Sequence, residues 1–338
     1  MMKLISLRFA SMCFAAMVTA SLALSQNITG AGATFPYPIY SQWFSEFKKT
    51  HGSVQINYQS LGSGAGIRQL EAGTVDFGAS DKPMTDEEIG KQKVKPLHFP
   101  TVMGGVVPIY NLPGYSGDVK FSSQALAGIF LGTISKWNDP ILLKDNPGLP
   151  DKNIVVVHRS DGSGTTFVFS DFLAKVSPEW KSKCGTSASI KWPVGLGAKG
   201  SEGVTGLVKQ TPFSVGYVEL IFATQNKIGY GSVKNAAGNF IKADINSVSA
   251  AASGAAKNMP ADYRVSIANA AGKDSYPIST FTWLLIPSTI ADVNKKKALI
   301  EFLHWMLKDG QKMAGALGYA PLPPSVIAMV DKSIAQVQ

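Results

Sequence analysis

The segment from Asn27 to Ala79 alternates between strand-like runs and stretches with helical spacing, and this alternation limits the possible folds more than any other feature. In its first helical stretch, aromatic residues recur at intervals of three and four positions: Tyr40, Trp43, Phe44 and Phe47. That spacing is typical of a helix that buries one face. The runs VQINYQSL and TVDFGAS are predicted strands, and GAGIRQLEAG between them is a predicted helix. Strands and helices alternating at this length predict an α/β fold with a mostly parallel sheet.

Two long extended runs divide the rest of the chain. FPTVMGGVVPIYNLPG begins at Phe99 and SYPISTFTWLLIP begins at Ser275, and the block between them has its own strands and helices. Two extended crossings on either side of an inserted block predict two lobes joined by a two-stranded hinge. We therefore expect one lobe built from 26–111 and 276–338, a second lobe from 112–275, and a ligand cleft between them.

The N-terminus has the features of an export signal. Lys3 and Arg8 precede an apolar run from Phe9 to Leu24, whose end supplies the small residues of a cleavage site. The run is short for a membrane span and has no stop-transfer flank. Residues 1–25 are therefore predicted to be a cleavable signal peptide, with a mature chain that starts near Gln26.

Composition excludes several functional classes. The net charge is +9, but charged residues make up only 16% of the chain and no Arg-rich stripe indicates a nucleic-acid partner. The run Lys295–Lys297 is predicted to be the solvated face of a helix. Cleavage of the signal would leave Cys184 as the single cysteine, which rules out a disulfide within the mature chain and a cysteine-based metal site. The histidines show no metal-ligand spacing, and His304 is predicted to pack within a helix.

Three glycine-containing turns each follow a predicted strand and open a predicted helix. They are GAGATFPYPIY from Gly30, LGSGAGIRQL from Leu61 and VVVHRSDGSGTTFVFSDFL from Val155. The first N–H groups of such helices have no internal partner, and the helix dipole favours an anion beside them. Four hydroxyl residues add donors at the same points: Thr34, Ser63, Ser163 and Thr165. Ordinary N-caps and turn glycines would look similar, but we predict that the three turns face one small anion.

Two charged side chains support an oxyanion. The guanidinium of Arg159 fits two oxygens of a tetrahedral anion, and Asp161 is close enough in the chain to hold it; the alternative is a surface ion pair. Asp81 ends a strand at the edge of the sheet where α/β folds bind ligands. A carboxylate repels an anion unless the anion carries a proton, so Asp81 is either a proton acceptor or a simple helix cap.

Other motifs do not support catalysis. GLGAKG, from Gly195 to Gly200, has the spacing of a dinucleotide loop but lacks a preceding buried strand and an acidic partner. Neither Ser63 nor Ser163 lies in a G-x-S-x-G elbow. A secreted phosphatase using Ser163 with His158 stays an alternative, but the sequence favours a binding protein without cofactor or metal.

The chain also resembles a known family. TGAGATFP, NYQSLGSGAG, TVDFGASD, FPTVMGGVV, HRSDGSGTTFVFSDFLAKV, KWPVGLGAKG and GYVE are similar to segments of the periplasmic phosphate-binding protein of ABC phosphate importers, and the match extends from about Thr29 to LGYAPLP. The resemblance implies a type II periplasmic binding protein fold whose lobes close over inorganic phosphate. It further implies a monomeric periplasmic protein, not an enzyme, that delivers phosphate to an inner-membrane permease and ATPase complex.

The resemblance also assigns residues. The implied phosphate ligands are Thr34, Phe35 through its backbone N–H, Ser63, Asp81, Arg159, Ser163, Gly164 and Thr165. Asp81 would accept the proton of hydrogen phosphate, and Asp161 would orient Arg159. The chain departs from the family at Gly64-Ala65-Gly66, where relatives can carry a second Ser, and at His158, where some carry another basic residue. A sulfate or molybdate binder stays an alternative, although a buried Asp81 facing a fully deprotonated dianion argues against it.

Overall fold

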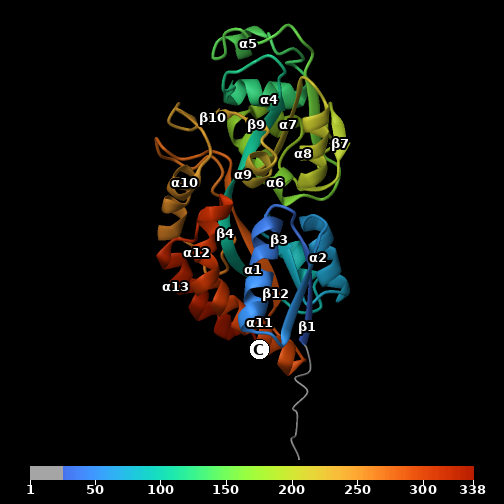
Figure 1. Cartoon of the computed structure of the whole chain (residues 1–338), viewed down its shortest axis with the longest axis vertical. Coiled ribbons are helices and arrows are strands. Elements are labelled where there is room, and N and C mark those ends of the chain that lie inside the picture. Colours follow the sequence, from blue (N-terminus) through green and yellow to red (C-terminus); the bar gives the residue numbers. More distant parts are fainter. Residues whose placement is uncertain (1–25) are drawn as a thin grey trace, which may run out of the picture.

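The computed structural model describes residues 26–338, and it shows two α/β lobes stacked end to end (Figure 1). This confirms the predicted two-lobed α/β class. The predicted signal peptide, residues 1–25, lies outside the described residues. Among the residues described, no helix is both long and apolar enough to cross a bilayer.

The lower lobe in Figure 1 contains the N-terminal and C-terminal elements. Its strands are β1 (Gln26–Gly32), β2 (Val54–Ser60), β3 (Phe77–Ser80) and β12 (Ser279–Pro287). Its helices are α1 (Tyr37–Thr50), α2 (Ser63–Ala72), α3 (Asp86–Gly90), α11 (Val293–Trp305), α12 (Gln311–Ala314) and α13 (Pro324–Ser333), with a π-helical turn at Met306–Gly310. The four aromatic residues predicted to form the buried face of the first helix are all buried, which confirms that face of α1.

The upper lobe contains the inserted block (Figure 1). Its strands are β5 (Lys120–Phe121), β6 (Val155–Arg159), β7 (Leu196–Ala198), β8 (Ser214–Glu219), β9 (Gly229–Tyr230), β10 (Ser232–Lys234) and β11 (Phe240–Ile241). Its helices are α4 (Ser123–Leu131), α5 (Pro140–Leu143), α6 (Gly164–Val176), α7 (Pro178–Lys183), α8 (Gly200–Gln210) and α9 (Leu220–Gln225). The next helix, α10 (Ile245–Lys257), packs against β12, α13 and the strand that joins the lobes.

That joining strand is β4 (Pro96–Asn111), which runs through both lobes. From Pro96 to Gly105 it pairs antiparallel with β12, and from Val106 to Asn111 it pairs antiparallel with β8. The strand order is β2-β1-β3-β12-β4-β8-β6-β7. Pairing is parallel from β1 to β2 and β3, and from β6 to β7 and β8, so the predicted parallel sheet is confirmed there but not at the antiparallel β4 and β12.

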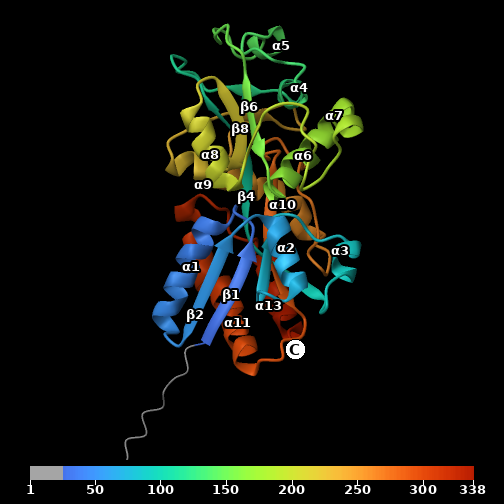
Figure 2. The ribbon, with the colours of Figure 1, turned by 90° about the vertical axis from the view of Figure 1, so that its right-hand side faces the viewer.

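This topology puts the ends of several strands at the lobe junction. In Figure 2 the arrowheads of β1 and β2 point toward the upper lobe, and β3 runs parallel to β1. The turns that follow these strands therefore lie between the lobes, where open α/β sheets bind ligands.

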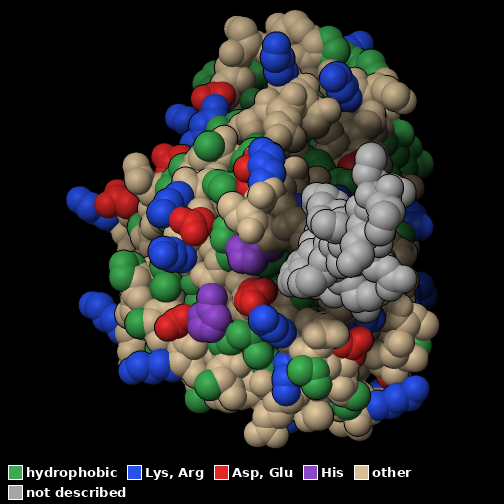
Figure 3. Space-filling model, turned by 60° about the horizontal axis from the view of Figure 1, so that its bottom comes forward, with side chains coloured by type: hydrophobic (Ala, Val, Ile, Leu, Met, Phe, Trp, Pro, Cys, Tyr) green, Lys and Arg blue, Asp and Glu red, His purple; other side chains and the backbone are tan. Residues whose placement is uncertain are grey.

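Surface charge is mixed on the described part of the face that Figure 3 shows, where basic and acidic side chains are interspersed. Lys295, in the first turn of α11, pairs with Asp76 at 2.8 Å, and Lys297 is exposed, in line with a solvated helix face. The prediction that His304 packs within a helix is wrong. Its side chain is 50% exposed and its Nδ1 lies 2.9 Å from an Asp331 oxygen.

Candidate anion-binding site

The structure brings the three glycine turns together at the lobe junction. Two of them follow β1 and β2 in the lower lobe, and the third joins β6 to α6 in the upper lobe. The turn after β3, which contains Asp81, lies beside them. The side chains predicted to bind an anion are each at most 3% exposed: Thr34, Phe35, Ser63, Asp81, Arg159, Ser163 and Thr165. A set of polar groups this deeply buried needs internal partners, since an unpaired buried polar group is costly.

Arg159 is held in place by its neighbour in the same turn. Its Nε donates to Asp161 Oδ1 at 2.7 Å and its Nη2 donates to Asp161 Oδ2 at 2.5 Å. Burial alone would raise the pKa of Asp161, but the hydrogen bonds and charge of Arg159, with the N–H of Gly200, hold that pKa below its ordinary value. The two side chains are only 2% and 13% exposed, so this is a buried pair and not a surface ion pair.

The third guanidinium nitrogen of Arg159, Nη1, contacts the lower lobe. Its Nη1 donates to Thr34 Oγ1 at 3.2 Å and is 3.5 Å from Ser201 Oγ. Ser201 is a site residue that sequence reasoning missed, although the glycine run before it provided a signal. That run, GLGAKG, was compared with a dinucleotide loop and with a segment of the family but not with the glycine turns, yet it leads into α8 in the same way as they do.

Ser63 joins the two lobes at a second point. Its Oγ accepts from the backbone N–H of Asp81 at 3.2 Å and from that of Gly164 at 3.1 Å. A hydroxyl has two lone pairs and one proton, so the Ser63 proton is left to be donated elsewhere. A Cβ on Gly164 would lie 2.5 Å from Ser63 Oγ and 2.7 Å from Asp81 Cβ, and this close approach explains the glycine.

The carboxyl of Asp81 has a raised pKa. Burial raises its pKa to about 7, against the opposing effects of the Thr282 hydroxyl, the Arg159 charge and the hydroxyls of Ser63 and Thr165. Thr282 Oγ1 donates to Asp81 Oδ1 at 2.8 Å, and sequence reasoning had missed this residue of β12. A carboxyl with this pKa can hold or release a proton near neutral pH.

Residues at the start of α6 and after β1 complete the surroundings. Ser163 Oγ caps α6 by accepting from the N–H of Thr166 at 3.0 Å. Thr165 Oγ1 is buried and, among the described residues, has no hydrogen-bond partner. The Phe35 carbonyl accepts from Tyr319 Oη at 2.6 Å, which fixes the backbone at that turn. The site therefore presents hydroxyl groups, one guanidinium and one titratable carboxyl.

His158 is not arranged as a catalytic base for Ser163. Its Nδ1 lies 3.1 Å from the carbonyl oxygen of Arg159, and its ring stacks on Trp192 with centroids 4.8 Å apart. Among the described residues no hydrogen bond joins His158 to Ser163. The geometry thus gives no support to the phosphatase alternative.

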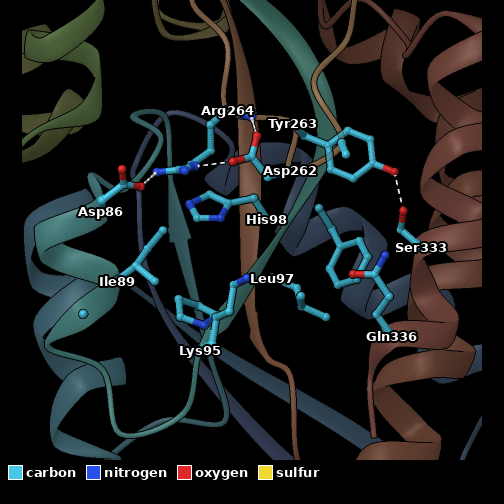
Figure 4. Close-up of a pocket in the computed structure, with 14 residues that line it drawn as sticks. Asp86, Ile89, Lys95, Leu97, His98, Asp262, Tyr263, Arg264, Ser333 and Gln336 are labelled. Atoms are coloured by element: carbon cyan, nitrogen blue, oxygen red, sulfur yellow. Dashed lines mark hydrogen bonds and ion pairs between the residues drawn. The ribbon is translucent and has the colours of Figure 1, made fainter.

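A separate cavity of about 470 Å³ lies in the lower lobe, lined by α3, the start of β4, residues 261–264 and the C-terminal helices (Figure 4). We call it the lower-lobe cavity. In it Arg264 donates to Asp262, to Asp86 and to the Met84 carbonyl. Burial lowers the pKa of His98 to about 4, with a smaller contribution from the Arg264 charge. None of the predicted anion-site residues lines this cavity.

The chain is similar to known proteins in sequence. A family model described as a PBP superfamily domain matches residues 18–309. The chain is 46% identical over 310 residues to phosphate-binding protein PstS of Xylella fastidiosa strain Temecula1, covering 91% of this chain and 84% of that protein. It is 44% identical over 315 residues to phosphate-binding protein PstS of Haemophilus influenzae, covering 92% and 93%.

Solved structures share the fold. A high-affinity periplasmic phosphate-binding protein, PfluDING, bound with phosphate, superposes with a TM-score of 0.75 at 24% identity, over 91% of this chain and 94% of that chain. A phosphate-binding protein from Stenotrophomonas maltophilia gives a TM-score of 0.70 at 19% identity, over 91% and 93%. At these identities the likeness is one of fold.

Proposed function

The chain belongs to the PBP superfamily and, within it, to the PstS phosphate-binding proteins, and from this premise we propose that it captures inorganic phosphate between its lobes and delivers it to an ABC permease for import. The single observation that best supports this is the buried guanidinium of Arg159. It is fixed by Asp161 and directed at hydroxyl groups from both lobes. A desolvated, preorganised fork of this kind suits a tetrahedral oxyanion.

The proposed ligands are the predicted residues: Thr34, Phe35 through its N–H, Ser63, Asp81, Arg159, Ser163, Gly164 and Thr165. Arg159 would supply the positive charge, while hydroxyls and helix N-termini would supply neutral donors to the phosphate oxygens. Asp81, as the acceptor of the remaining phosphate proton, would turn a repulsive contact into a hydrogen bond. The Thr282 hydroxyl and the Arg159 charge both act to lower the pKa of Asp81, and so favour the ionised form that this part needs.

We propose that the ligand drives closure of the lobes. The described conformation has contacts across the junction: the N–H of Gly64 donates to the carbonyl of Gly162 at 2.9 Å, in addition to the Ser63 and Thr34 contacts above. An anion bound by both lobes would favour this closed state through its differential affinity. The moving parts would be close to the predicted division into 26–111 with 276–338 and 112–275, with bending in β4 and the segment leading into β12. Residues 261–264 would move with the lower lobe, because Arg264 bonds to Asp86 and to the Met84 carbonyl.

The biological setting is also part of the proposal. The chain would act as a monomeric periplasmic binding protein, exported after removal of residues 1–25, and its partners would be an inner-membrane permease and its ATPase. It would bind and release phosphate without transforming it and without a cofactor. N-terminal sequencing of the exported protein should find a start near Gln26.

Calorimetry on the mature protein tests the central claim. Phosphate should bind at one site per chain and sulfate should bind far more weakly, because sulfate has no proton for Asp81. Equal binding of the two anions, or no binding of phosphate, would overturn the proposal. Incubation with a chromogenic phosphate ester should release no product, and enzyme-like turnover would favour the phosphatase alternative instead.

A further inference from the structure

A fourth glycine turn reaches the same point as the three predicted ones. It joins β7 to α8, and Gly200 there has a φ of +72°, a left-handed conformation that favours glycine. The N–H of Gly200 donates to Asp161 Oδ1 at 3.0 Å, and the N–H of Ser201 donates to Thr34 Oγ1 at 3.2 Å. The N-terminus of α8 is therefore tied to both the residue that holds Arg159 and the hydroxyl that Arg159 contacts.

The side chain of Ser201 is part of this contact. Its Oγ lies 2.9 Å from Thr34 Oγ1, and the two residues are 0% and 2% exposed. Ser201 belongs to the upper lobe and Thr34 to the lower, so the pair bridges the junction. Bulk water cannot reach either hydroxyl in this conformation, so both must find their hydrogen-bond partners within the site.

Counting those protons and lone pairs gives a constraint. Thr34 Oγ1 already accepts from Arg159 Nη1 and from the Ser201 N–H, which fills both of its lone pairs. The Ser201 hydroxyl proton therefore has no acceptor on Thr34. The Thr34 proton can be donated to Ser201 Oγ, but then the Ser201 proton must be donated outside the pair. In every arrangement at least one of the two hydroxyls donates to a third group.

We propose that Ser201 is a further residue of the anion site and that it acts as one unit with Thr34, presenting a hydroxyl proton to an oxygen of the bound oxyanion. The inference rests on the proposed phosphate-binding function and extends it. Arg159 Nη1 contacts both of these hydroxyls, so a phosphate oxygen bound at the guanidinium would be the acceptor nearest to that proton. Because the pair spans the junction, losing it removes both a donor and a contact that exists only in the closed state.

Ser201→Ala should weaken phosphate binding by about 3- to 10-fold, the loss expected for one neutral hydrogen bond. Most of the change should appear as faster phosphate release, since a closed-state contact is lost. Ser201→Thr keeps the hydroxyl and should restore much of the affinity. The matched control is Ser214→Ala, which removes another fully buried upper-lobe hydroxyl, bonded to the Val208 and Thr211 carbonyls, and should leave phosphate affinity unchanged.

A double-mutant cycle tests whether the pair acts as a unit. Thr34→Val removes the hydroxyl at nearly constant shape, and in that background Ser201→Ala should cost clearly less than in the wild type. Thermal denaturation of each variant checks folding, and Ser201→Thr provides a second variant should Ser201→Ala fold poorly.

The outcomes separate this inference from the proposed function. Wild-type protein that does not bind phosphate overturns both. Wild-type binding with an unchanged affinity in Ser201→Ala, or with fully additive losses in the cycle, overturns the role of Ser201 alone.

Discussion

Two regions of the molecule contain the same chemical groups and use them differently. In the anion site Arg159 pairs with Asp161, and in the lower-lobe cavity Arg264 pairs with Asp262, each two positions away in the chain. The Arg159 side chain is 2% exposed and directs Nη1 at hydroxyls, whereas Arg264 is 25% exposed and uses Nη1 on a carboxylate and a carbonyl. Arg159 Nη1 therefore contacts a hydroxyl that can itself donate to an anion, whereas Arg264 Nη1 contacts only acceptors.

The carboxyl groups of the two regions differ in the same way. Burial raises the pKa of Asp81 to about 7. Desolvation also acts to raise the pKa of Asp262, but the hydrogen bonds and charge of Arg264 together hold that pKa below its ordinary value. The two regions thus differ in burial and in the partners of their charged groups, since those at the junction contact hydroxyls as well as each other. Burial and these hydroxyl contacts, not the size of an opening, are the basis of the proposed site.

The largest effect expected concerns selectivity. Asp81→Asn replaces a proton acceptor with an amide that can donate, so sulfate should no longer be penalised. A site that pairs a proton of its ligand can bind that ligand about 10⁴-fold or more tightly than an analogue without the proton. In Asp81→Asn much of this preference for phosphate over sulfate should be lost, while phosphate binding stays measurable. The measurement is the ratio of phosphate to sulfate dissociation constants at fixed pH and ionic strength. Asp262→Asn should leave the ratio unchanged, and an unchanged ratio in Asp81→Asn would reduce Asp81 to a structural cap.

The two carboxyls should also give opposite pH dependence of stability in ligand-free protein. The pKa of Asp81 is above its unfolded value of 3.8, so the folded state binds the proton more tightly and stability falls as pH rises from about 4 to about 7. The difference between these pKa values limits the effect to about 4 kcal/mol, and lobe opening, which hydrates Asp81, reduces it. Asp81→Asn cannot titrate, so its melting temperature should rise relative to wild type across this range.

Asp262 provides the contrast for that experiment. Its lowered pKa means that it stabilises the folded state above its ordinary pKa, and that this contribution is lost as pH falls through its folded value. Asp262→Asn should therefore be destabilised at neutral pH and match wild type in acid. Parallel pH profiles for the two variants would contradict the difference in burial described above.

Arg159→Ala should weaken phosphate binding by about 10- to 100-fold, because a charge-assisted hydrogen bond contributes roughly 1.5–3 kcal/mol. Titration calorimetry with phosphate measures the effect. Lys295→Ala, which removes the same charge at the Asp76 ion pair on the lower lobe, should barely change affinity. Equal losses in the two variants would show that binding depends on overall charge and not on this site.

The sequence could predict features set by neighbouring residues, but not contacts between residues that are far apart in the chain. The glycine turns and the α1 face follow from spacing within a few residues, so they were found. Thr282 was not, because its contact with Asp81 depends on the antiparallel register that sets Trp283 opposite Ser80. Ser201 was missed because its glycine run was not compared with the other glycine turns, although it has the same strand-to-helix setting.

The lower-lobe cavity was beyond sequence reasoning for the same reason. Its wall combines α3, residues 261–264 and α13, which are far apart in the chain and meet only through the packing of the lower lobe. Arg264 has an Asp two positions away, as Arg159 does, but it does not lead into a glycine turn that opens a helix. Only the fold shows which pair is enclosed by both lobes.

The smallest expected effect on binding is that of Arg264→Ala, the variant that matches Arg159→Ala most closely. It removes a guanidinium paired with Asp262, as the other removes one paired with Asp161, but its groups face the lower-lobe cavity. Phosphate affinity should stay within about twofold of wild type, since long-range charge is screened over about 10 Å in ordinary buffer. Stability should fall modestly, because partly exposed ion pairs contribute about 0–1 kcal/mol each and the Met84 carbonyl loses a donor. Calorimetry and urea unfolding on the same preparation separate the two effects. A loss of affinity comparable to that of Arg159→Ala would mean that the cavity and the junction are coupled. The partners of the two guanidinium groups would then not explain their different roles.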